Sequence, residues 1–213
     1  MIQYSIVTEQ PDSEPVTLQE AKIHLEYTGT AKNNYITTLI SVARYLCEAY
    51  SGLSFVTQTR RVKLDYFPCT KYDVVNQKIY IELPYGPVQS VESFTYEKDD
   101  DTTVTLTEGT DFLLDAHSRI ARVYPIGDDG TIDSWPSDLK NIPHPITIEY
   151  NAGYDDVSGE PLPTQAKTAI LMYLTKYFEG RGDEQGKGFN DVLPWECMHI
   201  LDSIKVTWNA NYD

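Results

Sequence analysis

Hydrophobic residues recur at helical spacing in two segments near the start of the chain. The TLQE motif at 17–20 matches a capping box, in which Thr17 and Glu20 satisfy each other's backbone N–H groups. This motif predicts a short helix that stops at Gly29. The next apolar run predicts a helix of about four turns that ends at Gly52. Its apolar positions are Ile36, Leu39, Ile40, Ala43, Leu46, Cys47 and Tyr50.

From about residue 55 the apolar residues alternate with polar ones, which is typical of half-buried strands. Val62, Leu64 and Tyr66 follow this rule, with charged residues between them. Turn-forming residues separate the strand-like runs, among them Asp129 and Gly130. Many short strands at this spacing predict an antiparallel sandwich or barrel-like module. The further runs lie at 79–83, 88–96, 103–107, 112–115, 119–124 and 146–150.

Helical spacing returns after Pro163, a residue well suited to the first turn of a helix. The predicted helix is apolar on two sides, so we expect it to be central. A polar, glycine-rich loop follows at 180–188, and Pro194 opens a last helix that extends to about Ile204. The tail at 206–213 begins with a strand-compatible pattern.

The order of these elements predicts an α+β fold. We expect a helical bundle formed by both chain ends, with an antiparallel β-sandwich-like module inserted between the second and third helices. The expected boundaries are 1–54 for the N-terminal helical part, 55–155 for the β module, and 156–213 for the C-terminal helical part with its tail.

Composition narrows the function classes. The chain has 17 Lys and Arg residues against 32 Asp and Glu residues, a formal net charge of −15, which excludes a protein that grips duplex DNA through its phosphates. The start of the chain does not have the pattern of a signal peptide, and no apolar run approaches the length of a membrane span, so no membrane association is expected. Cys47, Cys69 and Cys197 are scattered, which favours a reducing cytosol over a disulfide framework.

Motifs for catalysis, cofactors and metals fail on inspection. Ser54 follows Gly52 as in a nucleophile elbow, but Val56 stands where the second glycine is needed. The glycine-rich segment 182–188 has one residue too few for a phosphate-binding loop, and Gly188 replaces the Ser or Thr. The four histidines lie in four different elements without metal-binding spacing. We therefore expect no catalytic, cofactor-binding or metal-binding residue, and not an enzyme.

The order of several motifs resembles the tailed-bacteriophage head-to-tail connector family, also called adaptor or head-completion proteins. Each motif is short, but their order and spacing run from about residue 15 to about residue 204. The motifs are PVTLQEAKIHL at 15–25, EAYSG at 48–52, TQT at 57–59, RVKLDYFP at 61–68, IELPYGPVQSV at 81–91, FTY at 94–96, IEYNAGY at 148–154, LPTQAKTAI at 162–170 and YFE at 177–179.

This resemblance implies a structural protein of the virion neck, made in the host cytoplasm. Members of the family form a homo-oligomeric ring, usually dodecameric, beneath the portal protein. The ring joins the capsid to the next neck or tail component and surrounds the channel for genome packaging and ejection. The family implies no cofactor. The acidic charge would let DNA slide through the lumen without specific binding, although it would equally keep a monomer soluble before assembly.

The resemblance also directs attention to two sets of residues. We expect the tail to dock on the portal protein, and the apolar stripes of the last two helices to meet neighbouring subunits, although these stripes could equally be intramolecular core. The portal-binding candidates are Lys205, Val206, Trp208 and Tyr212. The subunit-interface candidates are Leu171, Leu174, Phe178, Trp195, Met198 and Leu201.

Two other functions stay open. The 16 tyrosines could make the β module a carbohydrate- or receptor-binding domain of a virion protein, with exposed aromatic residues on one sheet face. A carboxylate-based hydrolase of the cell envelope is the enzymatic alternative. With 32 carboxylates some pair would lie close by chance, so no pair can be nominated.

Overall fold

The computed structural model describes residues 2–68, 79–117, 120–154, 161–180 and 193–206. These residues fall into two compact units. The β unit contains the described residues of 2–10 and 57–153, and the helical unit contains those of 11–56 and 154–206. Both sheets of the β unit are antiparallel. The fold is therefore α+β, as the sequence predicts.

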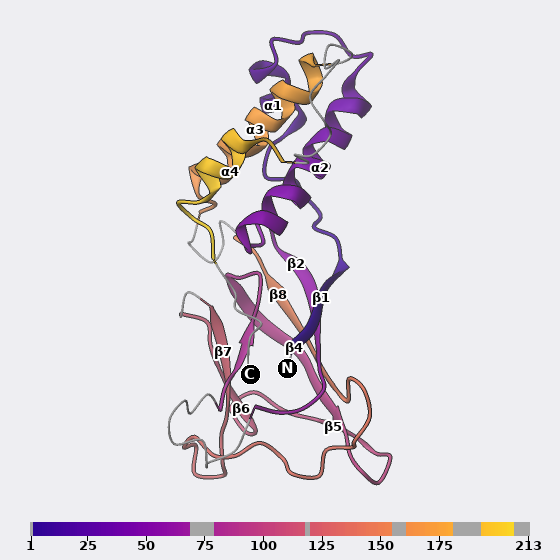
Figure 1. Ribbon diagram of the computed structural model, residues 1–213, viewed down its shortest axis with the longest axis vertical. Coiled ribbons are helices and arrows are strands. Elements are labelled where there is room, and N and C mark those ends of the chain that lie inside the picture. The colour runs from indigo at the N-terminus through magenta and orange to yellow at the C-terminus, as the bar shows by residue number, and fades with distance from the viewer. Residues whose placement is uncertain (1, 69–78, 118–119, 155–160, 181–192, 207–213) are drawn as a thin grey trace. The chain divides into compact units, whose positions relative to one another are not determined.

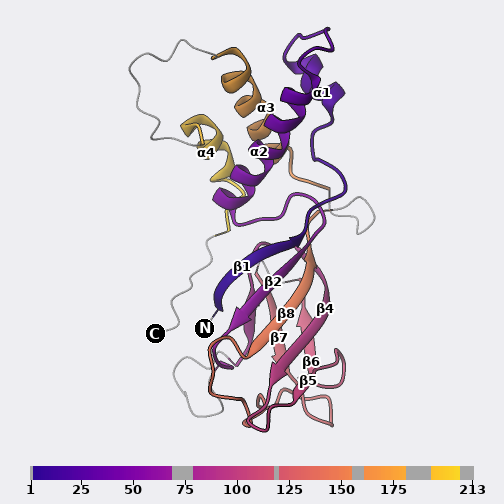
Figure 2. The same cartoon turned by 90° about the vertical axis from the view of Figure 1, so that its right-hand side faces the viewer.

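The strands of the β unit form two sheets (Figures 1 and 2). The larger has the order β1-β2-β8-β4-β5, and the smaller has the order β3-β7-β6. The larger sheet consists of β1 (Ile2–Glu9), β2 (Gln58–Leu64), β8 (Ile146–Ala152), β4 (Val88–Glu97) and β5 (Thr103–Thr105). The smaller consists of β3 (Ile81–Leu83), β7 (Ala121–Pro125) and β6 (Phe112–Asp115).

The two sheets share one hydrophobic core. It forms because successive side chains of a strand point to opposite faces, so every second residue can face the other sheet. On β2 and β8 every second residue is buried; the buried positions of β8 are all hydrophobic, and β2 contributes Val62 and Leu64 to the core. Phe94 of β4 lies 5.3 Å from Phe112 of β6, measured between ring centroids, and so links the two sheets. The Tyr150 hydroxyl donates to the Pro84 carbonyl at 2.6 Å, which satisfies a fully buried polar group.

Strand β1 is a departure from the expected boundaries, which assign residues 1–54 to the helical part. It pairs antiparallel with β2 and belongs to the β unit. Its described side chains are half-buried from Ser5 to Thr8 and exposed at Glu9, because β1 is an edge strand. Ile2, Tyr4 and Ile6 alternate with polar residues, but Val7 interrupts the pattern, so the alternating run is short.

The helical unit contains α1 (Leu18–His24), α2 (Asn33–Ser51), α3 (Thr164–Glu179) and α4 (Trp195–Leu201) (Figure 1). Apolar residues of all four share one core with the segments that flank α1 and α2. The capping box of α1 is confirmed: the Thr17 backbone N–H donates to the Glu20 carboxylate at 2.7 Å, and the Glu20 N–H donates to the Thr17 hydroxyl at 3.1 Å. The Thr17 backbone N–H and the Thr17 hydroxyl both donate to the Glu20 carboxylate, and these two hydrogen bonds lower the pKa of Glu20.

Candidate functional site

The chain after α4 is fastened to the end of α2. The Tyr50 hydroxyl donates to the Asp202 carboxylate at 2.6 Å, which raises the pKa of Tyr50. The Lys205 ammonium lies 3.9 Å from the centre of the Tyr50 ring, and the Val206 N–H donates to the Ser51 carbonyl at 2.8 Å. The structure thus places Lys205 and Val206, two of the expected portal-binding residues, at the point where the tail departs. Trp208 and Tyr212 lie outside the described residues.

Gly52 is required at this point for two reasons. It caps α2 in the left-handed conformation, with φ +70°, as the sequence predicts. A Cβ atom on residue 52 would also stand 2.5 Å from the Val206 carbonyl oxygen, closer than such atoms approach. The close approach of the tail to α2 therefore depends on the absence of a side chain at position 52.

The expected subunit-interface residues divide into three groups. Leu174 and Leu201 are fully buried in the core of the helical unit, so their side chains are covered by the chain's own helices. For these two residues the intramolecular alternative holds, because an apolar stripe packs the same way against its own chain as against a neighbour. Leu171, Phe178 and Met198 are half-buried against the same core.

Phe178 also packs against residues near the start of α2. Its ring lies 5.7 Å from that of Tyr27 and 6.4 Å from that of Tyr35, measured between centroids. The Lys32 ammonium lies 4.7 Å from the centre of the Phe178 ring. Much of the surface that Phe178 could offer to another subunit is therefore already in use within the helical unit.

Trp195 forms the third group, because it remains exposed over 63% of its surface. It lies on the outer side of α4 beside His199, and the centroids of the two rings are 6.4 Å apart. The opposite side of α4 carries Cys197, whose thiol donates to the Ala169 carbonyl at 3.3 Å. Burial raises the pKa of Cys197 to about 11 and also raises that of Cys47. Helix α4 therefore presents one large apolar side chain to the solvent.

The outer face of α2 is a feature that sequence reasoning missed. All residues of this helix are described, and none of its exposed positions carries a charge. Val42 and Tyr45 stand at its centre, with 39% and 64% of their surfaces exposed. The signal that could have found it is the lack of charged residues at solvent-facing positions, in a chain of net charge −15. The exposed positions are Asn34, Thr37, Thr38, Val42, Tyr45 and Ala49.

The two charged residues of α2 are both turned inward. Arg44 and Glu48 are almost fully buried and lie 3.1 Å apart, N to O. The Arg44 Nε also lies 2.8 Å from the Glu14 carboxylate, and the other Glu48 oxygen accepts the Phe55 N–H at 2.7 Å. This network ties the segments before α1 and after α2 to one helix face and keeps charge off the opposite face.

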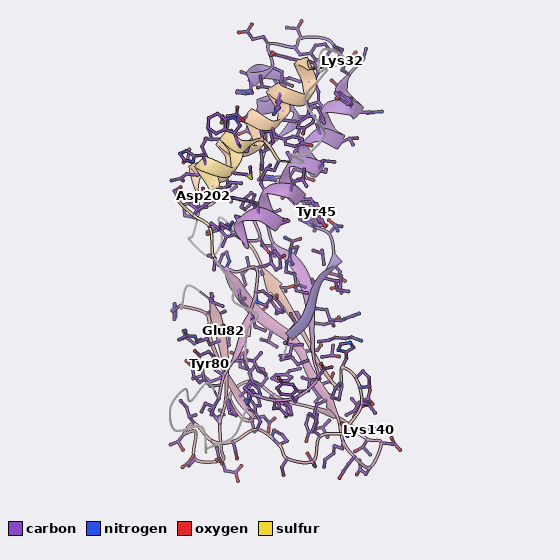
Figure 3. All side chains as sticks on the ribbon, viewed as in Figure 1. Lys32, Tyr45, Tyr80, Glu82, Lys140 and Asp202 are labelled. Carbon is purple, nitrogen blue, oxygen red and sulfur yellow. The ribbon has the colours of Figure 1, made fainter. Side chains whose placement is uncertain are left out.

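The β unit carries an aromatic cluster on the outer face of its smaller sheet. Tyr80 and Tyr124 have ring centroids 5.3 Å apart, and the Arg122 guanidinium lies 4.4 Å from the centre of the Tyr80 ring. The Arg122 Nε stands 3.8 Å from the Glu82 carboxylate. Figure 3 labels Tyr80 and Glu82 on this sheet. Partial burial raises the pKa of Tyr80.

The described parts of the chain hold no group of three or more His, Cys, Asp or Glu side chains that could bind a metal ion. The His24 Nε2 lies 2.9 Å from the Thr175 hydroxyl oxygen, and the His144 Nδ1 lies 3.2 Å from an Asp65 carboxylate oxygen. Ser54 is fully buried. Within the same ranges, every helix is too short or too polar to cross a membrane.

Comparison with known proteins gives matches in structure alone. No protein-family model and no curated protein matches the chain. A chain of the virion of native gene transfer agent (GTA) particle matches with a TM-score of 0.69 at 14% identity, over 98% of this chain and 99% of its own length.

Two chains from neck assemblies match similarly. One is from the neck of empty GTA particle computed with C6 symmetry, with a TM-score of 0.66 at 16% identity, covering 99% of this chain and 100% of that chain. The other is from the neck of native GTA particle computed with C12 symmetry, with a TM-score of 0.65 at 15% identity, covering 98% and 100%. At these identities the likeness shows a shared fold.

Proposed function

We propose that this chain is a structural subunit of a virion neck. In this proposal, copies form a closed ring beneath the portal protein, join the capsid to the next neck or tail component, and surround the DNA exit channel. The observation that carries the proposal is the end-to-end match to chains of GTA neck assemblies computed with C6 and C12 symmetry. The match covers both the β unit and the helical unit.

The organisation of the helical unit supports this role. Its core combines α1 and α2 from one end of the chain with α3 and α4 from the other. We propose that this arrangement is a bundle formed by both chain ends, which presents a rigid surface for ring contacts. Helices that are locked by a common core hold exposed residues in fixed positions, which a repeated subunit contact requires.

The charge of the chain supports passage of DNA without specific binding. A net charge of −15 in each copy would give a ring a strongly negative field. Such a field repels phosphate, so DNA would move through the lumen without being held. We also propose that the role is non-enzymatic and that the subunit acts through its surfaces.

The tail is the proposed contact with the portal protein. Lys205 and Val206 leave the helical unit from a fixed point, because Tyr50 and Ser51 hold them against the end of α2. A segment that starts from a fixed point loses less conformational freedom on docking than a free chain end does. Deletion of residues 206–213 should abolish co-sedimentation with the portal protein, and unchanged co-sedimentation would contradict this contact.

Quantitative mass spectrometry of purified particles tests the neck role. We expect this chain at a low copy number close to that of the portal protein, because both would form one ring at one vertex. The major capsid protein in the same sample provides the calibration. Absence from the particle, or a copy number typical of tail fibres, would contradict the neck role.

The cluster of Tyr80, Arg122 and Tyr124 favours a second candidate, a carbohydrate- or receptor-binding role of the β unit. Aromatic rings and a guanidinium on one sheet face provide contact area at low entropic cost. A glycan array tests this candidate with the whole protein and with the Tyr80→Ala and Tyr124→Ala variants. Selective binding lost in both variants would favour it, and a blank array would remove it.

A further inference from the structure

We infer that the uncharged outer face of α2 is a contact surface for a second copy of this chain, which meets it with the Trp195 side of α4. This inference deepens the proposed ring by naming the two faces that join neighbouring subunits. The α2 face is defined by Asn34, Thr37, Thr38, Val42, Tyr45 and Ala49.

The charge pattern of the helices supports this inference. Charged residues are depleted at the centres of protein interfaces, whereas free surfaces carry them. The exposed positions of α1 include Glu20 and those of α3 include Lys167 and Glu179, as is usual for a solvated helix. On α2 the only charges, Arg44 and Glu48, are buried in the network with Glu14 and Phe55. The α2 face therefore has the composition of a surface that is covered.

Two hydroxyl groups on or beside this face can lose water at little cost. The Thr38 hydroxyl donates to the Asn34 carbonyl at 2.9 Å, and the Ser41 hydroxyl at the margin donates to the Glu14 carboxylate at 2.6 Å. Since these donors already have partners, burying them leaves no unsatisfied hydroxyl proton. Val42 and Tyr45 contribute the apolar area, and tyrosine is enriched among residues that dominate binding.

The net charge of the chain indicates which partner occupies the α2 face. Each chain carries a net charge of −15, so two copies repel each other over most of their surfaces. A contact between copies is then most favourable where one side adds no charge, and the α2 face meets this condition. A basic partner such as a polycation would instead need acidic residues here, and α2 exposes none.

The positions of α2 and α4 in the helical unit suit a closed ring. A closed ring uses two different faces of each subunit, and in a twelvefold ring these faces are turned by only about 30° from directly opposite. Figure 3 shows Tyr45 on the outer side of α2 and Asp202, the residue after α4, on the other side of the helical unit. Trp195 is the large exposed apolar residue of α4. Its indole fits an apolar surface centred on Val42 and Tyr45.

Sedimentation velocity over a concentration series tests the α2 face. Val42→Glu combined with Tyr45→Glu places like charges on the contact without touching the core. We expect it to weaken self-association at least 100-fold relative to the unaltered chain. Ile23→Glu is the matched control, since Ile23 of α1 is 69% exposed and lies on neither face. Circular dichroism should show the same helix content in all three proteins.

Cross-linking tests the pairing of the two faces. In a Cys69→Ser background, Thr38→Cys chains are mixed with His199→Cys chains and treated with a bis-maleimide. Both positions are exposed, and they leave Tyr45 and Trp195 intact. We expect a 38-to-199 product between different chains, and no 38-to-38 product from Thr38→Cys chains alone.

Several outcomes would overturn the inference. Self-association that survives Val42→Glu with Tyr45→Glu, or that Ile23→Glu abolishes, would place the contact elsewhere, while the ring itself would stand. A 38-to-38 product would indicate a two-fold contact in place of a ring contact. An unaltered chain that stays monomeric throughout would also overturn it, and the copy number in particles would then judge the neck role separately.

Discussion

The Glu48 carboxylate accepts the backbone N–H of Phe55 at 2.7 Å, across the end of α2 and its Gly52 cap. The same carboxylate is paired with Arg44, so one buried carboxylate holds both the Arg44 guanidinium and the Phe55 N–H in place. The hydrogen bond holds the segment after Gly52 against the helix, and the ion pair holds Arg44 toward Glu14.

Replacing Glu48 with alanine should destabilise the helical unit by about 3 kcal/mol, because it removes one of the two carboxylates paired with the buried Arg44 and the acceptor of the buried Phe55 N–H. Urea denaturation followed by circular dichroism measures this change. Glu179→Ala is the control, since Glu179 is exposed at the end of α3 and should change stability by less than about 0.5 kcal/mol. Equal effects of the two substitutions would contradict the role of the network.

Gly52→Ala should destabilise the protein by about 2 kcal/mol. Roughly 1 kcal/mol comes from the left-handed backbone, and the remainder comes from the collision with the Val206 carbonyl. Gly130→Ala isolates the first contribution, because Gly130 has φ +74° and open space around its added Cβ. If the two variants lose the same stability in thermal unfolding, Val206 does not constrain position 52.

The capping box predicts a dependence of stability on pH. Because hydrogen bonds from Thr17 lower the pKa of Glu20, its contribution is complete above the ordinary value of 4.5 and is lost as the pH falls through the lowered folded value. We expect Glu20→Gln to be less stable than the unaltered chain near pH 7 by under about 1 kcal/mol, given solvent screening. The difference should close toward pH 3. A difference that stays constant in denaturation curves across this range would contradict the prediction.

Tyr50→Phe should loosen the start of the tail while keeping the ring beneath Lys205. It removes the hydrogen bond to Asp202 and should cost under about 1 kcal/mol at this exposed site. The Val206 N–H, which bonds to Ser51, should exchange with deuterium several-fold faster. Tyr45→Phe is the comparison, and its Val206 exchange should match that of the unaltered chain. Unchanged exchange in Tyr50→Phe would show that the backbone bond alone holds the tail.

The elements whose side chains alternate or recur regularly could be predicted from the sequence. Ile36, Ile40, Ala43 and Cys47 are all buried on α2, and Gly52 ends that helix as expected. Strand β1 was missed because its alternating run is short and lies before two helices, far in the chain from the other strands. The capping box was predictable because its chemistry is contained within four residues.

The candidate site was predictable only in part. Leu174 and Leu201 lie on apolar helix faces, but the pattern cannot say whether such a face packs against its own chain or against a neighbour. The α2 face escaped notice because sequence reasoning followed the apolar positions, whereas the signal lies in which exposed residues lack charge. Burial completes that signal, because it separates the buried Arg44 and Glu48 from the exposed Val42 and Tyr45.

The buried cysteines make the two units distinguishable in solution. Of three cysteines in the chain, Cys47 and Cys197 are buried in the core of the helical unit, with their thiol pKa values raised. In a Cys69→Ser chain a thiol-specific reagent would react only when that core opens. The labelling rate would then report the unfolding of one unit inside the intact protein, and comparison with the global transition would show whether the two units melt together.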